Sequence, residues 1–257
     1  MTTQTGDMIL KRFDMNTIEP NATILLIGKR GSGKSTLIKD IMFNLRTKIN
    51  YGIVMSRSEE ANQHFASFIP RSSIYTDYSD GPIGRLMQYQ KKNIKKGRHM
   101  FMILDDCMFD NKILKGTTIR ELYLNGRHYQ TLIINATQYI MDIPPAIRNN
   151  TDYVFLFKDN IHTNREKVWK HFFGIFSEYS DFNEVLDKAT ENFGCVVLNT
   201  RIQSCNPSDC VFFYHAKQNI QPFRVCDPCF WNLDSQFSRQ QNEETDEKRL
   251  VVPKKIK

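Results

Sequence analysis

Short apolar runs alternate along this chain with longer segments in which apolar residues recur every three or four positions. Most of the short runs are continuously apolar, which is typical of parallel strands that helices cover on both faces. We predict strands at residues 22–27, 51–56, 100–105, 131–136, 151–157, 195–199 and 211–214. Helices are expected over residues 35–45, 85–96 and 164–179. The alternation indicates an α/β fold with a mostly parallel central sheet and helices on both faces.

The length and composition are sufficient for one α/β domain. The chain has 257 residues, of which 40% are hydrophobic and 25% are charged, and this argues against global disorder. We expect residues 1–20 to lead onto the first strand, residues 21–234 to form the domain, and residues 235–257 to be a mobile tail of mixed charge. No apolar run approaches the roughly 18 residues that a membrane span needs, so we expect a soluble protein without a membrane span.

A glycine-rich segment directly follows the first predicted strand and precedes the first predicted helix. It fits the phosphate-loop pattern G-x-x-x-x-G-K-[ST] and consists of Gly28, Lys29, Arg30, Gly31, Ser32, Gly33, Lys34, Ser35 and Thr36. Glycines allow the backbone N–H groups to turn towards phosphates, and the helix N-terminus adds a positive dipole end. Lys34 is expected to reach the β- and γ-phosphates, and the Ser35 hydroxyl is expected to bind Mg²⁺. The alternative is a glycine-rich turn with an incidental lysine.

Two further predicted strands end in polar residues of the kind that phosphoryl chemistry uses. The strand at 100–105 ends in Asp105 and Asp106, of which the first would hold Mg²⁺ through water and the second would polarise the attacking water. The strand at 131–136 is followed by Gln138, whose amide would lie near the γ-phosphate and sense its loss. For both strand ends, the alternative is a solvated turn.

Arg127 precedes the strand that leads to Gln138 and is therefore expected at the opposite edge of the sheet from the phosphates of its own chain. From there it could reach the γ-phosphate of a neighbouring subunit as an arginine finger. Arg148 is a second candidate for this role. The alternative for both is an ordinary structural salt bridge.

Charge is unevenly distributed along the chain. The 35 Lys and Arg against 28 Asp and Glu give a net charge of +7, which favours a polyanionic partner without deciding a function. Residues 81–104 contain no acidic residue but six basic ones, namely Arg85, Lys91, Lys92, Lys95, Lys96 and Arg98. This stretch is either a surface that grips nucleic-acid phosphates or simply a solvated helix face.

Taken in order, the segments GKRGSGKS, FMILDD, GRHY, INATQ, IPPAIRNN and DYVFLF and the ending VFFYHAKQNIQPFRVCDPCFW resemble the genome-packaging ATPases of nucleocytoplasmic large DNA viruses and virophages. These belong to the FtsK/HerA class of P-loop motors. The resemblance covers about residues 20–232 and implies a RecA-like P-loop NTPase core that uses ATP and Mg²⁺. Asp106 stands where many motor ATPases carry Glu.

The resemblance also implies partners and a location. It implies a homo-oligomeric ring that moves double-stranded DNA into a preformed capsid, with capsid vertex or portal components as further partners. The host cytoplasm, at a viral factory, and the virion are the implied locations. By position, Lys34 and Ser35 would bind nucleotide and metal, Asp105 and Asp106 would serve the metal and the water, Gln138 would sense, and Arg127 would be the finger.

Two other functions use a similar loop and stay open. A nucleoside or nucleotide kinase is one, although we find no arginine-rich lid, and a nucleotide-stabilised, non-catalytic component of a capsid vertex is the other. A signalling GTPase is disfavoured, since residues 111–114 lack the Asp of its guanine-reading tetrad. An ABC-type subunit is disfavoured by the missing LSGGQ-like signature.

Four cysteines near the C-terminus have spacings that zinc sites use. Cys205 and Cys210 form a C-x₄-C pair and Cys226 and Cys229 a C-x₂-C pair, with His215 as a substitute ligand. A predicted strand falls between the pairs, which favours reduced thiols over zinc. The histidines show no metal or triad pattern and are expected to be packing or surface residues, and both tryptophans are expected in the core.

Overall fold

The computed structural model describes residues 8–107, 113, 116–139 and 143–236. The tail predicted at 235–257 lies outside these residues except for its first two positions. No helix within the described ranges is long and apolar enough to span a bilayer.

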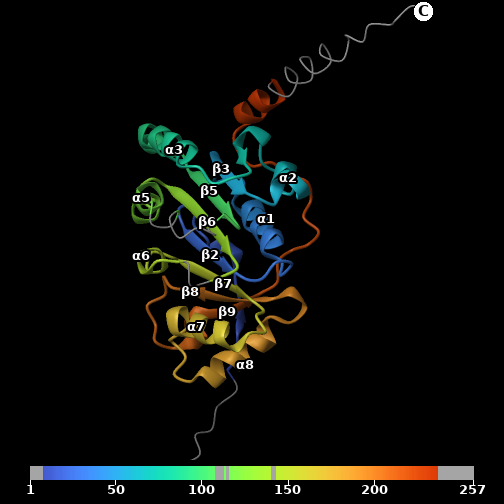
Figure 1. The fold of residues 1–257 in the computed structure, drawn as a ribbon, viewed down its shortest axis with the longest axis vertical. Helices are drawn as coiled ribbons and strands as arrows, with labels where there is room; N and C mark the ends of the chain where they lie inside the picture. The colour runs from blue at the N-terminus through green and yellow to red at the C-terminus, as the bar shows by residue number, and fades with distance from the viewer. Residues whose placement is uncertain (1–7, 108–112, 114–115, 140–142, 237–257) are drawn as a thin grey trace, which may run out of the picture.

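Nine strands of the described chain form one sheet in the order β1-β9-β8-β7-β2-β6-β5-β3-β4 (Figure 1). Every paired strand runs parallel to its neighbours except β8, which is antiparallel to β7 and β9. The strands are β1 (Lys11–Arg12), β2 (Thr23–Ile27), β3 (Tyr51–Ser56), β4 (Ile74–Tyr75), β5 (Met100–Asp105), β6 (Thr131–Thr137), β7 (Tyr153–Phe157), β8 (Cys195–Asn199) and β9 (Val211–Tyr214). The predicted α/β fold with a mostly parallel sheet is confirmed.

Helices cover both faces of the sheet (Figure 1). One face is covered by α1 (Lys34–Leu45) and α2 (Glu59–Asn62). The other is covered by α3 (Asp80–Asn93), α5 (Thr117–Asn125), α6 (Pro145–Arg148), α7 (His162–Phe172) and α8 (Tyr179–Ala189). A short helix, α9 (Pro207–Cys210), precedes β9.

The two faces of each central strand contribute to two separate cores. In β2, Ile24 and Leu26 pack in the core on the α1 side, whereas Leu25 and Ile27 pack in the core on the α3 side. All four side chains are buried, and this explains why the strand reads as a continuous apolar run. The buried sheet is a rigid platform for the loops that leave its ends.

The helix predicted at 164–179 is wrong, because the structure has two helices there. The first, α7, ends at Phe172, and α8 begins only at Tyr179. Between them the chain turns at Gly174, and Phe173 and Phe176 stay buried in the core, so the apolar periodicity continues through a break in the helix. The helix predicted at 85–96 instead begins at Asp80 and ends at Asn93, followed by one 3₁₀ turn.

Residues before the first predicted strand also belong to the sheet. Strand β1 pairs in parallel with β9, and Phe13, Met15 and Ile18 are buried on the α1 side. The described part of segment 1–20 is therefore an integral part of the domain. This contribution depends on β9, whose Phe212 and Phe213 pair with Lys11 and Arg12, and the local sequence pattern does not indicate it.

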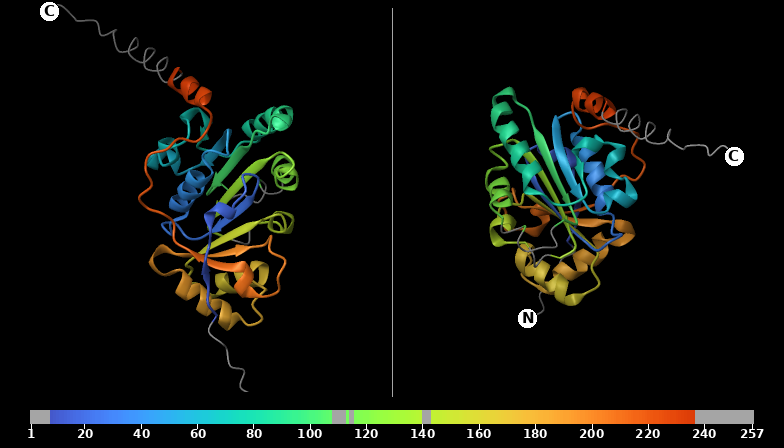
Figure 2. Two further views of the ribbon diagram at one scale, coloured as in Figure 1. Left: turned by 180° about the vertical axis from the view of Figure 1, so that it is seen from behind. Right: turned by 45° about the horizontal axis from the view of Figure 1, so that its top comes forward.

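The C-terminal segment at 215–236 crosses the α1 side of the molecule from β9 to the opposite edge of the sheet (Figure 2). Phe223 stacks on Phe68 with ring centroids 5.1 Å apart, and the Val225 N–H donates to the Phe68 carbonyl at 2.9 Å. Asp227 accepts hydrogen bonds from Asn50 and Arg98. The segment therefore connects one edge of the sheet, near β9, with the opposite edge.

Both tryptophans are half-buried, and Trp169 packs against the core on the α3 side, so the prediction that both lie in the core is wrong in degree. The indole N–H of Trp169 donates to the Phe176 carbonyl at 3.1 Å, and that of Trp231 donates to the Val225 carbonyl at 2.7 Å. Each indole thus satisfies its single donor with a nearby carbonyl.

Candidate nucleotide-binding site

The phosphate loop, the acid pair and Gln138 meet at one edge of the sheet. Strands β2, β6 and β5 are parallel neighbours, so the loops after them leave from the same edge. Two hydrogen bonds fix these loops to the end of β6: Gly28 N–H donates to the Thr137 carbonyl at 3.1 Å, and Asp106 N–H donates to the Ala136 carbonyl at 3.2 Å. The predicted elements are therefore held together by the backbone itself.

The loop has the conformation that its glycines permit. Gly31 and Gly33 have φ values of +78° and +103°, which residues with a Cβ rarely adopt. At Gly28 a Cβ would lie 2.6 Å from Ser32 Oγ and 2.8 Å from Phe157 Cβ, so no side chain fits there. These positions let the backbone curl tightly before α1 begins at Lys34.

Lys34 is folded back over the loop. Its Nζ donates to the Gly28 carbonyl at 2.7 Å and to the Lys29 carbonyl at 3.1 Å. Burial lowers the pKa of Lys34, and the negative charges of Asp106 and Asp105 act in the opposite direction. An ammonium group thus stands between the loop and two carboxylates.

Asp105 is buried and has two hydroxyl partners. Its Oδ2 accepts from Ser56 Oγ at 3.0 Å and from Ser58 Oγ at 3.4 Å. Burial raises the pKa of Asp105, and the charge of Asp106 raises it further, while the Ser56 bond and the Lys34 charge oppose both. A desolvated carboxylate beside a second carboxylate is a strong attractor for a divalent cation.

Asp106 and Gln138 are in direct contact. The Gln138 amide Nε2 donates to Asp106 Oδ2 at 3.2 Å. Asp106 also has a φ of +50°, a left-handed conformation that turns it away from the line of β5. The two residues that the sequence assigns to water activation and to sensing are therefore one hydrogen-bonded unit.

Sequence reasoning missed three residues of this site. Ser56 and Ser58 hold Asp105, and His64 Nε2 donates to the Ser35 carbonyl at 3.0 Å. We read His64 from the sequence as a packing or surface residue. A correct prediction of the strand order would have placed the two serines near Asp105, because β3 lies beside β5 and ends at the same edge.

The residues present fit a triphosphate and its metal. Ser32 Oγ is buried and has no hydrogen-bond partner within the described residues, so the loop contains a polar atom that a phosphate oxygen would satisfy. The Ser35 hydroxyl and the Asp105 carboxylate are the oxygen donors that Mg²⁺ prefers. The same edge of the sheet therefore offers a hydrogen-bond donor to a phosphate and oxygen ligands to a metal ion.

Both arginine candidates make contacts within their own chain. Arg127 lies in the turn before β6, at the edge of the sheet opposite the phosphate loop, as predicted. It forms an ion pair with Asp152, a buried carboxylate that also accepts from Thr23 N–H at 2.9 Å. Arg148 Nη1 donates to the Ile143 carbonyl at 3.2 Å. A role in a neighbouring subunit stays a prediction for both.

The structure does not bring the four C-terminal cysteines together, as a zinc site would require. Across the part of the chain that the structure describes, which includes all four, no three His, Cys, Asp or Glu side chains are grouped to hold a metal ion. Cys210 is the last residue of α9, directly before β9, whereas Cys226 lies in the middle of the C-terminal segment. All six cysteines are free thiols.

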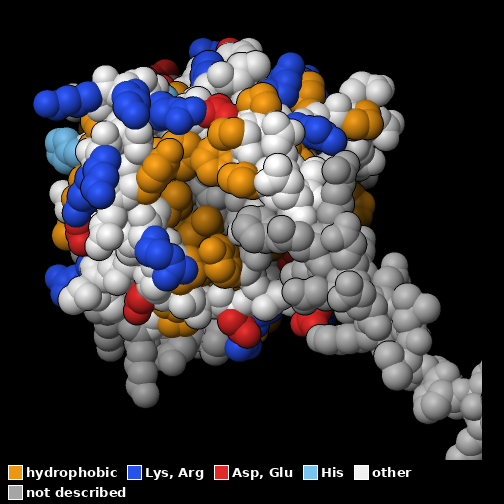
Figure 3. Space-filling view, turned by 90° about the horizontal axis from the view of Figure 1, so that it is seen from above, with side chains coloured by type: hydrophobic (Ala, Val, Ile, Leu, Met, Phe, Trp, Pro, Cys, Tyr) orange, Lys and Arg blue, Asp and Glu red, His pale blue; other side chains and the backbone are white. Residues whose placement is uncertain are grey.

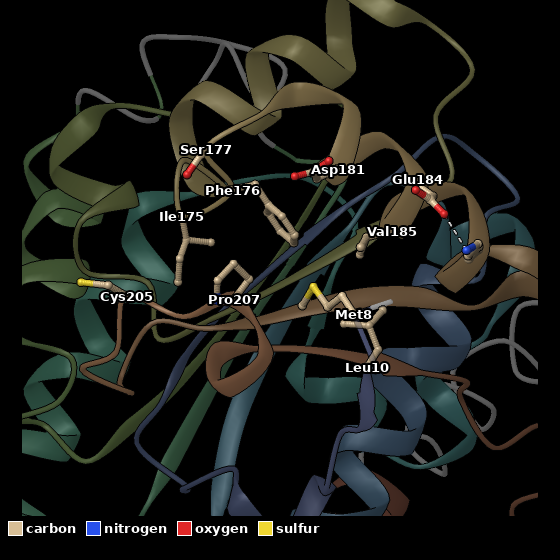
Figure 4. A pocket seen from close by; sticks show the side chains of 11 residues that line it. Met8, Leu10, Ile175, Phe176, Ser177, Asp181, Glu184, Val185, Cys205 and Pro207 are labelled. Atoms are coloured by element: carbon tan, nitrogen blue, oxygen red, sulfur yellow. Dashed lines mark hydrogen bonds and ion pairs between the residues drawn. The ribbon is translucent and has the colours of Figure 1, made fainter. Parts of the chain in front are cut away.

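A cavity of about 540 Å³ lies at the edge of the sheet opposite the phosphate loop, beside the residues that precede β1 and β9 (Figure 4). Met8, Leu10 and Phe176 contribute apolar surface, and Asp181 and Glu184 stand on its border. Within the described residues its lining contains no glycine-rich loop, and its Lys188 pairs with Glu184 at 2.6 Å, so it is not the nucleotide site.

Comparison with known proteins finds viral relatives. A family model described as "Poxvirus A32 protein" matches residues 10–172. Protein 088R of Invertebrate iridescent virus 3 is 30% identical over 231 residues, which are 84% of this chain and 88% of that protein. Protein 015R of Frog virus 3 is 34% identical over 207 residues, which are 78% of this chain and 64% of that protein. Both relatives are described as uncharacterized.

Solved structures share the fold. The genome packaging NTPase B204 of Sulfolobus turreted icosahedral virus 2, in complex with AMPPCP, has a TM-score of 0.58 and 19% identity, and covers 78% of this chain and 100% of its own. The same NTPase in complex with ATP-gammaS has a TM-score of 0.59. At this level of identity the likeness establishes a shared fold.

The burial of Asp105 predicts a measurable effect on stability. Because folding raises the pKa of Asp105, its ionised form disfavours the folded state, and Asp105→Asn is expected to raise the melting temperature at pH 7 in the absence of nucleotide. The gain should shrink as the pH falls towards the usual range of a carboxyl, since the wild-type side chain then takes up a proton. Thermal unfolding at pH 7 and pH 4.5 tests this.

The matched control is Asp77→Asn, which changes an exposed carboxylate paired with Arg57 and should leave the melting temperature nearly unchanged. A lower melting temperature for Asp105→Asn at pH 7 would show that the bonds from Ser56 and Ser58 outweigh the cost of burial.

Proposed function

The chain belongs to the poxvirus A32 protein family, and we propose that it is a genome-packaging ATPase that hydrolyses ATP to move viral double-stranded DNA into a preformed capsid. The observation that carries the proposal is the convergence of the phosphate loop, the acid pair and Gln138 on one edge of the sheet. The packaging NTPase B204, solved with ATP analogues, has the same fold and supports the choice of ATP.

Each group at this edge has a part in hydrolysis. The N–H groups of the loop and the ammonium of Lys34 neutralise the phosphate charge that develops as the γ-phosphate leaves. Ser35 and Asp105 would hold a Mg²⁺ ion, which would supply positive charge to stabilise the phosphates during hydrolysis. Asp106 orients and polarises the attacking water, and the hydrogen bond from Gln138 keeps its carboxylate in place.

The Asp106–Gln138 contact also offers a way to sense hydrolysis. Gln138 follows β6, whose last carbonyls hold both the loop and Asp106. Loss of the γ-phosphate removes a charge beside this unit, so the position of the Gln138 side chain would change with the nucleotide state. Through this change, the hydrolysis of ATP would be coupled to the movement of DNA.

The basic stretch 85–98 supplies a candidate surface for DNA. Lys91 pairs with Glu121 at 2.9 Å and lies over the Tyr129 ring, and Arg98 pairs with Asp227, so these two have structural roles. The remaining basic side chains of the stretch are exposed, namely Arg85, Lys92, Lys95 and Lys96. Figure 3 shows Lys and Arg side chains gathered beside a hydrophobic hollow on the face seen from above.

The assembly that such a motor requires is part of the proposal. We expect a homo-oligomeric ring at a capsid vertex or portal, active in the host cytoplasm at the viral factory. Arg127 would act on the γ-phosphate of a neighbouring subunit. Its exposed side chain supports this role, while its ion pair with Asp152 supports a structural one.

ATP hydrolysis is expected to depend on Lys34. Lys34→Ala removes the cation nearest the phosphates and should lower the ATPase rate at least a hundredfold, roughly the effect of removing one strong charge-stabilising group. The control Lys48→Ala changes an exposed lysine just beyond α1 and should have no effect. The measurement is release of inorganic phosphate with and without linear double-stranded DNA, which should raise the wild-type rate.

Two outcomes would contradict this. Equal rates for the wild type and Lys34→Ala would exclude the loop as the site of hydrolysis. Transfer of the phosphate to an added nucleoside or nucleoside monophosphate, in place of release, would favour a kinase.

DNA binding is expected to depend on the exposed lysine side chains of α3 and of the 3₁₀ turn after it. Replacing Lys92, Lys95 and Lys96 by Gln should weaken binding to double-stranded DNA and lower the slope of log affinity against log salt, by roughly 0.9 for each DNA phosphate that is no longer neutralised. The charge-matched control replaces Lys11, Lys170 and Lys188, which lie on other surfaces. An unchanged slope for the first variant would exclude this face as the DNA-binding surface.

A further inference from the structure

The turn between α8 and β8, residues 190–194, presents an aromatic side chain to solvent beside the phosphate loop. Phe193 is 66% exposed, although phenyl rings are ordinarily buried. Its φ is +62° and that of Asn192 is +51°, so two consecutive residues with side chains are left-handed. Such a conformation persists only where the surroundings impose it, and it is concentrated at functional sites.

The surroundings of the turn do impose it. The Glu191 carbonyl accepts hydrogen bonds from Gly194 N–H at 2.9 Å and from His215 Nε2 at 3.1 Å. A Cβ at position 194 would lie 2.3 Å from the Ala189 carbonyl oxygen and 2.9 Å from His215 Nε2, so only glycine fits. The end of α8 and the residue after β9 thus fix the backbone of the turn that carries Phe193.

Two cavities connect Phe193 to the phosphate loop. One has a volume of about 470 Å³, within the range of sites for small molecules. It is lined by Gly31, Gly33 and Thr36 on the loop side and by Asn192, Phe193, His215, Ala216 and Gln218 on the other. A second cavity of about 450 Å³ is also lined by Gly31 and Phe193, together with the cationic side chains of Lys29, Arg30 and Lys158.

The order of the strands indicates which end of a nucleotide faces Phe193. The acid pair and Gln138 lie on the β6 and β5 side of β2, and the γ-phosphate has to face them. Residues 190–194 precede β8 and residues 215–218 follow β9, both on the opposite side of β2. A nucleoside that leaves the loop near Thr36 would therefore enter the cavity that Phe193 borders.

We propose that Phe193 is the stacking platform for the purine base of the bound nucleoside triphosphate. Stacking on an aromatic ring requires only the π-face of the base, and the amides of Asn192 and Gln218 stand at the wall of the same cavity to contact its edge. The left-handed turn, which hydrogen bonds hold in place, keeps the ring exposed before a nucleotide binds. This inference rests on the proposed function, since it assumes that triphosphate occupies the phosphate loop.

The test compares binding of ATP with binding of inorganic tripolyphosphate, which has no base, both in the presence of Mg²⁺. Phe193→Ala is expected to weaken ATP binding by about 5- to 150-fold, the range for loss of one base–aromatic stack. It should leave tripolyphosphate binding unchanged, and Phe193→Tyr should restore ATP binding. The control Leu124→Ala removes a side chain of similar exposure (53%) on α5 and should change neither.

A second variant reports on the contact itself. In Phe193→Trp, ATP is expected to change the fluorescence of the new indole, after subtraction of the wild-type signal from Trp169 and Trp231, whereas tripolyphosphate should not.

Three results would overturn the inference. Unchanged ATP affinity in Phe193→Ala excludes stacking, and equal losses for ATP and tripolyphosphate show that the turn only supports the loop. A change in self-association without a change in ATP affinity assigns Phe193 to a subunit interface. If the wild type binds neither ligand, the proposed function itself fails.

Discussion

The end of strand β6 is the point on which the site depends. Its last two carbonyls accept hydrogen bonds from Asp106 on one side and from Gly28 on the other, at 3.2 and 3.1 Å. Because β6 lies between β2 and β5, these bonds set the separation between the phosphate loop and the acid pair. Gln138 continues directly from the same strand and donates to Asp106. Nucleotide binding, water activation and sensing are therefore coupled through one strand end.

This arrangement places unfavourable groups where the chemistry needs them. Asp105 is buried beside a second carboxylate, Lys34 is desolvated, Ser32 Oγ lacks a partner within the described residues, and Asp106 is left-handed. The two packed cores that flank the sheet hold these groups in place. A metal-bound triphosphate would compensate them together, because it brings cationic charge to the acids and oxygens to the donors. Folding alone does not explain this concentration of strained and desolvated groups at one edge.

Local patterns in the sequence were sufficient for much of the fold. The strands at 51–56, 100–105, 195–199 and 211–214 were predicted to the residue, since each is a short apolar run between polar turns. The phosphate loop and its glycines were also evident from spacing. The contributions of Ser56, Ser58 and β1 depend on which strands are neighbours, and local patterns do not encode that order. The turn at Gly174 was missed because buried phenylalanines continue the helical period through it, and Phe193 was missed because its position depends on the loop that it faces.

The central claim is that a magnesium-bound triphosphate binds at the C-terminal end of β2, where the phosphate loop and Asp105 would hold it. Calorimetric titration of the wild-type chain with a non-hydrolysable ATP analogue, in excess Mg²⁺ and again in excess chelator, tests it most directly. The account predicts binding at one site per chain with Mg²⁺ and at least a tenfold loss of affinity without it, because Asp105 and Asp106 then face the phosphates with no cation between them. Binding of equal strength under both conditions, or no binding under either, would contradict it.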